Sequence, residues 1–192
     1  MNCEDDHRKK MKRREVPGAI RFITFSCEHR LKLLANPKIA DLFVESMAQA
    51  RSRHGFRLYG WVVMPEHIHM LAAGTDDATL ESALESLKKS VATRVIRRRR
   101  LLRAPILQRL IRPNGLARFW LKGGGFDHNI RREGSFAKDV FYMHYNPVNR
   151  GLVVNPQEWP WSSVHWWLGN RGGICDCDEH PDPGWRGWRG FV

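Results

Sequence analysis

Two β-rich runs that lie almost end to end constrain the fold of this chain most strongly. Residues 56–64 (FRLYGWVVM) and 68–73 (IHMLAA) are separated by a short segment that contains Pro65. Proline cannot donate to a sheet ladder, so Pro65 belongs at a strand end or in a turn. Parallel neighbours would need a long crossover between them. We therefore expect these two strands to pair antiparallel.

A strand and a helix are predicted before this pair. Residues 19–27 are β-rich and apolar, which is typical of a strand that is buried on both faces. Asn36 and Pro37 are the residue types favoured at a helix N-cap and first turn. Apolar positions at helical spacing continue to about His54, and Gly55 is expected to end the helix.

A longer helix is predicted next, with Asp76 and Asp77 at its N-terminus. One apolar stripe runs along it: Leu80, Leu84, Leu87, Val91 and Val95. Residues 101–116 contain prolines and a glycine, and we expect an irregular or short helical excursion there.

Residues 118–121 and 126–131 are predicted to form short strands, and Ser135 is a candidate cap for a third helix that runs towards Pro147. Strands and helices thus alternate along the chain in a mixed order. This order predicts an α+β fold, in which helices pack on an antiparallel sheet in a ferredoxin-like layout.

The net charge of +12 favours a polyanionic partner, and nucleic acid is the expected one. No apolar run approaches the roughly 20 residues that span a bilayer, and no secretory signal is visible, so we expect a soluble cytoplasmic protein without a membrane partner. Unpaired bases could stack on Trp166, Trp167, Trp185 or Trp188, although core packing is the simpler role for the first two. The candidate phosphate contacts are Arg13, Arg14, Lys88, Lys89, Arg94, Arg97, Arg98 and Arg131. For the helical members, the alternative is an ordinary solvated helix face.

The four cysteines are expected to be reduced thiols. Cys175 and Cys177, with His180 nearby, could form a zinc clip. The signal is weak, because no second cysteine pair accompanies them.

Two histidines at the start of a predicted strand form a candidate metal site. Side chains alternate along a strand, so His67 and His69 share one face while Ile68 points to the core. Tyr142 and Asn146 are four residues apart on a predicted helix and therefore project together. Asn146 could complete a His67, His69 and Asn146 ligand set that leaves positions open for phosphate oxygens and water. Packing and helix capping are the simpler roles for these residue types.

Four blocks of the sequence resemble the single-tyrosine HUH transposases, and in particular the REP-associated tyrosine transposase branch. They are residues 60–69 (GWVVMPEHIH), 127–131 (DHNIR), 142–151 (YMHYNPVNRG) and 159–163 (WPWSS). The resemblance covers residues 18–167. It leaves a basic arm at residues 1–17 and a tail rich in Gly, Pro and Trp at residues 168–192.

The resemblance implies an activity as well as a fold. His67 and His69 match the paired metal ligands of the family, Tyr142 matches its nucleophile, and Asn146 matches the polar residue one helical turn later. Family members use Mg²⁺ or Mn²⁺ to cut single-stranded DNA next to a hairpin, such as a repetitive extragenic palindrome, and form a 5′-phosphotyrosine. We accordingly expect a hairpin-DNA partner near the bacterial nucleoid, no small-molecule cofactor, and a monomer in preference to a homodimer.

Some features stay open or depart from the family pattern. Tyr142 is preferred to Tyr145 because only Tyr142 has Asn146 at i+4, and Tyr59 is expected to pack in the core. The group that accepts the phenol proton could be Glu66 or His144. The excursion that ends near Gly115 looks longer than the family needs.

Two other functions remain: a non-catalytic hairpin-binding regulator, and a phosphodiesterase that uses water in place of the tyrosine.

Overall fold

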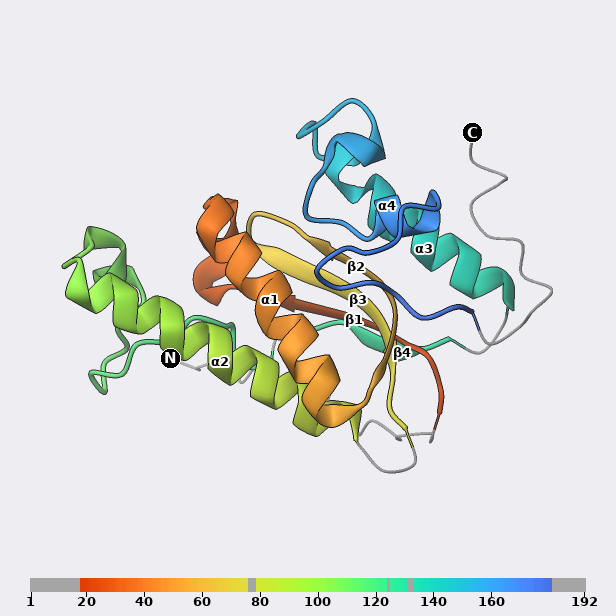
Figure 1. Ribbon diagram of the computed structural model, residues 1–192. Coiled ribbons are helices and arrows are strands. Elements are labelled where there is room, and N and C mark those ends of the chain that lie inside the picture. The colour runs from red at the N-terminus through yellow and green to blue at the C-terminus, as the bar shows by residue number, and fades with distance from the viewer. Residues whose placement is uncertain (1–17, 76–78, 124, 131–132, 181–192) are drawn as a thin grey trace, which may run out of the picture.

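The structure, a computed structural model, describes residues 18–75, 79–123, 125–130 and 133–180 (Figure 1). Its strands are β1 (Arg21–Ser26), β2 (Arg57–Val63), β3 (His67–Ala73) and β4 (Asp127–Asn129). Its α-helices are α1 (Pro37–His54), α2 (Leu80–Leu101), α3 (Glu133–Asn149) and α4 (Val164–Trp167). Short 3-10 helices are η1 (Glu28–Arg30), η2 (Leu33–Ala35), η3 (Pro105–Arg109) and η4 (Pro156–Glu158).

The strands form one sheet in the order β2-β3-β1-β4, and every neighbouring pair is antiparallel. Along the chain the sheet is built as β1-α1-β2-β3-α2-β4, which is the ferredoxin-like arrangement. β2 and β3 form the expected hairpin, in which Val63 pairs with Ile68. The predicted α+β fold is therefore confirmed.

Helix α1 begins and ends where its sequence signals predict. The Asn36 side chain accepts a hydrogen bond from the backbone N–H of Lys38, at 3.1 Å, and thereby caps the first turn. Gly55 ends the helix with a φ of 66°, a left-handed conformation that glycine adopts without the steric penalty of a Cβ atom.

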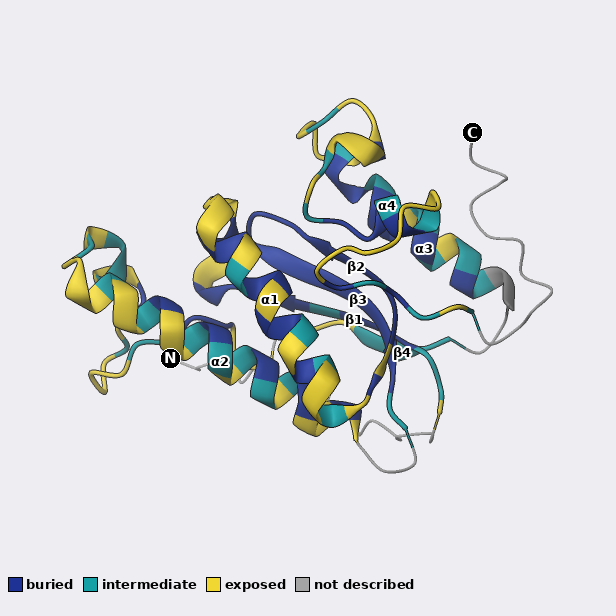
Figure 2. Ribbon diagram, viewed as in Figure 1, coloured by how far each residue is buried: buried dark blue, intermediate teal, exposed yellow. Residues whose placement is uncertain are grey.

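The two faces of the sheet carry two separate cores. Helices α1 and α2 cover one face and bury the main core, to which β3 contributes Ile68 and Met70 (Figures 1 and 2). Helix α3 covers part of the other face over a smaller cluster that includes Leu71. Because side chains alternate along β3, His67 and His69 share the α3 face with Leu71. The candidate histidines thus point towards the helix that carries Tyr142.

Close contacts with β2 hold α3 against the sheet. A Cβ atom at Gly60 would lie 2.5 Å from Cε of Met143, so glycine leaves room for this α3 side chain. The Ser163 hydroxyl accepts a hydrogen bond from the Trp61 backbone N–H and also bonds Nε2 of His144 on α3, each at 2.9 Å. The Trp-Pro-Trp-Ser-Ser segment therefore ties α3 to β2.

Several predicted element limits are wrong. Helix α2 has Thr79 as its N-cap, and Asp76 and Asp77 lie outside the described residues. Helix α3 begins at Glu133, so Ser135 lies within its first turn and does not cap it. Residues 118–121 form no strand, because only an isolated bridge between Trp120 and Cys27 pairs them with the sheet. The strand expected at residues 126–131 is limited to β4. The expected short helix within residues 101–116 is η3.

Part of the predicted C-terminal tail packs on β2. The Asp178 backbone N–H donates to the Leu58 carbonyl oxygen at 2.6 Å, and Cys175 and Cys177 are buried in the main core. The zinc clip is not supported: no cluster of three or more His, Cys, Asp or Glu residues suited to a metal ion occurs among the described residues. His180 instead packs its ring 4.3 Å from that of Phe136, centroid to centroid.

Across the residues that the structure describes, every helix is too short or too polar to serve as a membrane span.

Candidate functional site

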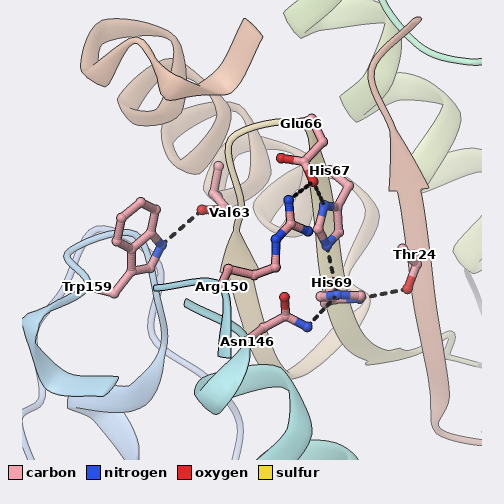
Figure 3. A network of polar contacts seen from close by, with 8 residues as sticks. All are labelled: Thr24, Val63, Glu66, His67, His69, Asn146, Arg150 and Trp159. Carbon is pink, nitrogen blue, oxygen red and sulfur yellow. Dashed lines mark hydrogen bonds and ion pairs between the residues drawn. The ribbon is translucent and has the colours of Figure 1, made fainter. Parts of the chain in front are cut away.

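Two imidazole rings at the start of β3 lie nearly perpendicular to each other on the α3 side of the sheet. The Nε2 atoms of His67 and His69 are 3.0 Å apart, and both side chains are buried (Figure 3). Two ligands at right angles, each about 2.1 Å from an octahedral cation, would be separated by about 3.0 Å. The spacing of the two nitrogen atoms therefore suits two neighbouring ligands of one divalent ion.

Each ring has an oxygen partner on its other nitrogen. Nδ1 of His67 lies 3.1 Å from Oε1 of Glu66, and Nδ1 of His69 lies 2.7 Å from Oγ1 of Thr24 (Figure 3). Metal-binding histidines commonly donate their second N–H to such an oxygen, which sets the tautomer and the ring orientation. If both Nδ1 atoms donate, both Nε2 lone pairs converge on one point, and a cation there removes their repulsion.

Burial keeps both imidazoles neutral, which a metal ligand requires. It lowers the pKa of His67 below its ordinary value, although the Glu66 carboxylate opposes the shift. Burial, together with neighbouring His67, lowers the pKa of His69 to about 3. Both rings are therefore available as lone-pair donors near neutral pH.

Asn146 adds a third polar group from α3. Its side-chain amide is buried, and Nδ2 lies 3.3 Å from Nε2 of His69 (Figure 3). A half-turn of this amide about its last torsion would present Oδ1 at the same position, and oxygen is the atom that hard cations bind. His67, His69 and Asn146 thus lie together, and they could hold a divalent cation.

Tyr142 lies beside this group and is half-exposed. Its ring centroid is 5.7 Å from that of His69 and 6.1 Å from that of Phe22. The other tyrosines are placed differently: Tyr145 stacks on Phe141, and Tyr59 is buried in the smaller cluster. Tyr142 is therefore the tyrosine that is placed next to the histidine pair and still reaches solvent.

The buried carboxylate of Glu66 pairs with the exposed side chain of Arg150 behind His67. Arg150 donates to Oε1 of Glu66 at 2.9 Å (Figure 3), and Oε2 of this carboxylate is buried without a hydrogen-bond partner among the described residues. Burial raises the pKa of Glu66, but its electrostatic interactions and hydrogen bonds with His67 and Arg150 outweigh this effect and bring that pKa below its ordinary value. Glu66 is therefore an ionised carboxylate that orients His67.

His144, the other candidate proton acceptor, lies away from the histidine pair. It is two residues from Tyr142 and so points to nearly the opposite side of α3. Its ring is fully buried and bonded to Ser163, and burial lowers its pKa to about 3. Of the two candidates, only Glu66 touches the site.

Sequence reasoning assigned no role to Thr24, Arg150 or Phe22, although all three contact the site. Thr24 and Phe22 lie on β1, and only the pairing of β1 with β3 brings them to His69. No local pattern could show this pairing. Arg150 had a signal, because it falls within the block of residues 142–151 that carries the family resemblance.

The candidate phosphate contacts that the structure describes all lie on α2. Lys88 places its ammonium group 4.3 Å from the centroid of the Phe25 ring, on the main-core side of the sheet. Lys89 and Arg97 line a groove of about 550 Å³ on α2, whereas Arg94 and Arg98 are exposed on another side of the helix. Arg13, Arg14 and Arg131 lie outside the described residues.

Of the four tryptophans that were candidates for stacking unpaired bases, the two that the structure describes pack within the protein. Trp166 is buried in the main core, and the indole N–H of Trp167 donates to the Tyr59 carbonyl oxygen at 3.1 Å. Trp185 and Trp188 lie outside the described residues.

Comparisons with known proteins show similarity to transposases in sequence and in fold. The family model for IS200-like transposases matches residues 19–109. The REP-associated tyrosine transposase of Escherichia coli is 26% identical over 153 residues, which are 78% of this chain and 79% of that protein. A putative REP-associated tyrosine transposase of Haemophilus influenzae is also 26% identical, over 77% of this chain and 81% of that protein. A solved REP-associated tyrosine transposase bound to a REP hairpin shares the fold, with a TM-score of 0.62 and 21% identity over 89% of this chain and 98% of that one.

Proposed function

We propose that this chain, which is similar to IS200-like transposases over residues 19–109 and to REP-associated tyrosine transposases, is a metal-dependent enzyme that nicks and rejoins single-stranded DNA beside hairpins. One observation carries the proposal. The Nε2 atoms of His67 and His69 converge beside Asn146, and the half-exposed Tyr142 lies next to them. Strand transfer through a phosphotyrosine needs both a metal site and a tyrosine beside it, and this arrangement supplies both.

Mg²⁺ or Mn²⁺ is the proposed metal ion. His67, His69 and Asn146 would hold it, while Glu66 and Thr24 orient the two imidazoles from behind. When bound, such an ion stabilises the negative charge that develops on the phosphate oxygens during displacement.

Tyr142 is the proposed nucleophile. Its phenol loses a proton, and the phenol oxygen forms a bond to phosphorus while the bond from phosphorus to the 3′ oxygen breaks. The leaving 3′ oxygen takes up a proton, so the products are a 5′-phosphotyrosine and a free 3′-hydroxyl. The phosphate ester remains an activated linkage, so attack by a 3′-hydroxyl reverses the step and rejoins strands without ATP. Half-exposure suits this role, because the ring must reach a bound DNA strand and also remain beside the histidines.

The proposed substrate is single-stranded DNA that adjoins a hairpin, such as a repetitive extragenic palindrome. The structural neighbour was solved with a REP hairpin, and the net charge of +12 suits a nucleic-acid partner. Such a protein would act on the nucleoid in the bacterial cytoplasm. The proposal takes the enzyme as a monomer, in which α3 of the same chain completes the site.

The nucleophile is tested by covalent capture. The full chain is incubated with Mn²⁺ and a labelled hairpin oligonucleotide that carries single-stranded flanks, and the products are separated on a denaturing gel. We expect a protein-linked DNA band that Tyr142→Phe abolishes. Tyr145→Phe, on the same helix but stacked on Phe141, is the matched control and should retain the band.

The two alternative functions predict different products in these experiments. Cleavage at the wild-type rate by Tyr142→Phe, without an adduct in either protein, would show that water is the nucleophile. Slower migration of the hairpin on a native gel, with no cleavage by the wild-type chain at any Mg²⁺ or Mn²⁺ concentration, would identify a non-catalytic DNA-binding protein.

A further inference from the structure

Phe126 presents a large aromatic side chain to solvent at the end of β4. The residue is 62% exposed, although phenylalanine is among the residue types most often buried. Its backbone is nevertheless anchored, because its carbonyl oxygen accepts a hydrogen bond from the Thr24 N–H at 2.7 Å. The exposed ring is therefore carried on a well-held segment of the sheet edge.

The preceding residue strengthens this anchor. A Cβ atom at Gly125 would lie 2.5 Å from the Thr24 carbonyl oxygen, and a backbone atom cannot move aside cheaply. Glycine thus allows the chain to pass close against β1 immediately before Phe126. This close passage keeps the backbone next to Phe126 against β1.

Phe126 lies on the same face of the sheet as the candidate metal site. β1 pairs with β4 so that Phe22 is opposite His128, and the hydrogen bond from Thr24 to Phe126 continues this register. Thr24 in turn is opposite His69 on β3. Residues directly opposite each other share a face, so Phe126, Thr24 and His69 form one row across the sheet. Their backbones span two strand spacings, about 10 Å.

A series of rings also connects Phe126 with Tyr142. The ring centroid of Phe126 is 5.0 Å from that of His128, and His128 is 5.6 Å from Phe22. Phe22 is 6.1 Å from Tyr142. Nε2 of His128 is 3.1 Å from the Asp139 carboxylate on α3, which holds this ring between the two exposed aromatics.

We propose that Phe126 is a base-stacking subsite, on which an unpaired nucleobase next to the phosphate at Tyr142 packs. This proposal rests on the proposed function, because it takes single-stranded DNA as the ligand. A nucleobase is the occupant that fits a lone flat ring beside a phosphate-handling site, since every base has a π-face that stacks on an aromatic side chain. The subsite would position the strand without reading its sequence.

A binding experiment tests the subsite separately from catalysis. Fluorescence anisotropy measures the affinity of the full chain for a hairpin with single-stranded flanks and for the same hairpin without them, with Tyr142→Phe in every protein to prevent cleavage. Phe126→Ala should weaken binding of the flanked hairpin by about 5- to 100-fold and leave binding of the unflanked hairpin unchanged. Phe126→Trp should restore the affinity, because indole also stacks.

Ile174→Ala is the matched control, because Ile174 is 68% exposed and precedes the segment that packs on β2, at the opposite edge of the sheet. It should bind both oligonucleotides as the parent protein does. Unchanged binding by Phe126→Ala, equal losses on both oligonucleotides, or no preference of the parent protein for the flanked hairpin would each overturn the subsite.

The adduct gel of the wild-type chain separates this result from that of the proposed function. If the wild-type chain forms an adduct and Phe126→Ala binds both oligonucleotides normally, the proposed nicking activity stands and the subsite is rejected. If Phe126→Ala selectively loses binding of the flanked hairpin but the wild-type chain forms no adduct, the subsite stands in a protein that only binds DNA.

Discussion

Each imidazole of the candidate metal site depends on one oxygen atom for its orientation. Glu66 bonds Nδ1 of His67, and its charge is balanced by Arg150. Thr24 bonds Nδ1 of His69 and carries no charge. The two histidines therefore have unlike supports, and the hydroxyl of Thr24 can be removed without leaving a buried charge unpaired.

Thr24→Val is expected to weaken the binding of Mn²⁺ by about 10- to 100-fold. Valine keeps the branched shape but cannot bond Nδ1 of His69, so the ring loses the partner that sets its tautomer. Isothermal titration with Mn²⁺ measures the affinity. Thr93→Val, at an exposed position on α2, is the control and should bind Mn²⁺ as the wild type does. Equal affinities in all three proteins would contradict a role for Thr24 in the site.

At the scale of elements, local signals set the limits of helices, and distant contacts set where they lie. Helix α1 is the clearest case of a local signal, since its cap and its terminal glycine lie next to it in the sequence. Helix α3 shows the second rule, because Gly60 and Ser163 place it on β2 from far along the chain. Tyr142 and Asn146 reach the histidines only through this docking.

Asn36→Ala is expected to lower the free energy of unfolding by about 1 kcal/mol. The substitution removes the side-chain oxygen that accepts from Lys38 N–H at the start of α1. Urea denaturation followed by circular dichroism measures the change. Asn170→Ala, an exposed asparagine after α4, serves as the comparison and should leave stability unaltered. A loss of the same size in both variants would argue against a specific capping role.

At the scale of the whole molecule, the two faces of the sheet have different roles: one carries the main core, and the other carries the candidate site. The face under α1 and α2 buries the larger core, and residues 175–178 extend that core along β2. The opposite face leaves room for the histidine pair and the half-exposed Tyr142. Changes on the first face should therefore alter stability without altering metal binding.

Asp178→Ala tests this separation. The Asp178 carboxylate accepts from the Leu58 backbone N–H at 2.7 Å and pairs with Arg51 at 2.8 Å, so its loss should lower the free energy of unfolding by about 1–2 kcal/mol. The affinity for Mn²⁺ should not change. Glu179→Ala is the control, because Glu179 is largely exposed and pairs with surface Arg171. A large loss of Mn²⁺ affinity in folded Asp178→Ala would show that the two faces are coupled.

Features that depend on near neighbours could be predicted. The β2-β3 hairpin, the limits of α1 and the common face of His67 and His69 all follow from residues within a few positions of each other. The predicted starts of α2 and α3 were wrong, because several residues near each boundary are equally suited to capping and only the folded backbone selects one. Thr24 could not be identified, since its contact depends on the register between β1 and β3.

The sequence by itself determined the residue types, the alternation that turns two imidazoles to one side, and the helical spacing that sets Asn146 one turn after Tyr142. Only the tertiary structure decided that these two pairs meet, that Arg150 reaches Glu66 across 84 positions, and that residues 175–178 join the core. The physical reason is range: dihedral preferences and side-chain periodicity act over a few residues. Strand register and helix docking are instead selected by the burial of the whole apolar surface at once.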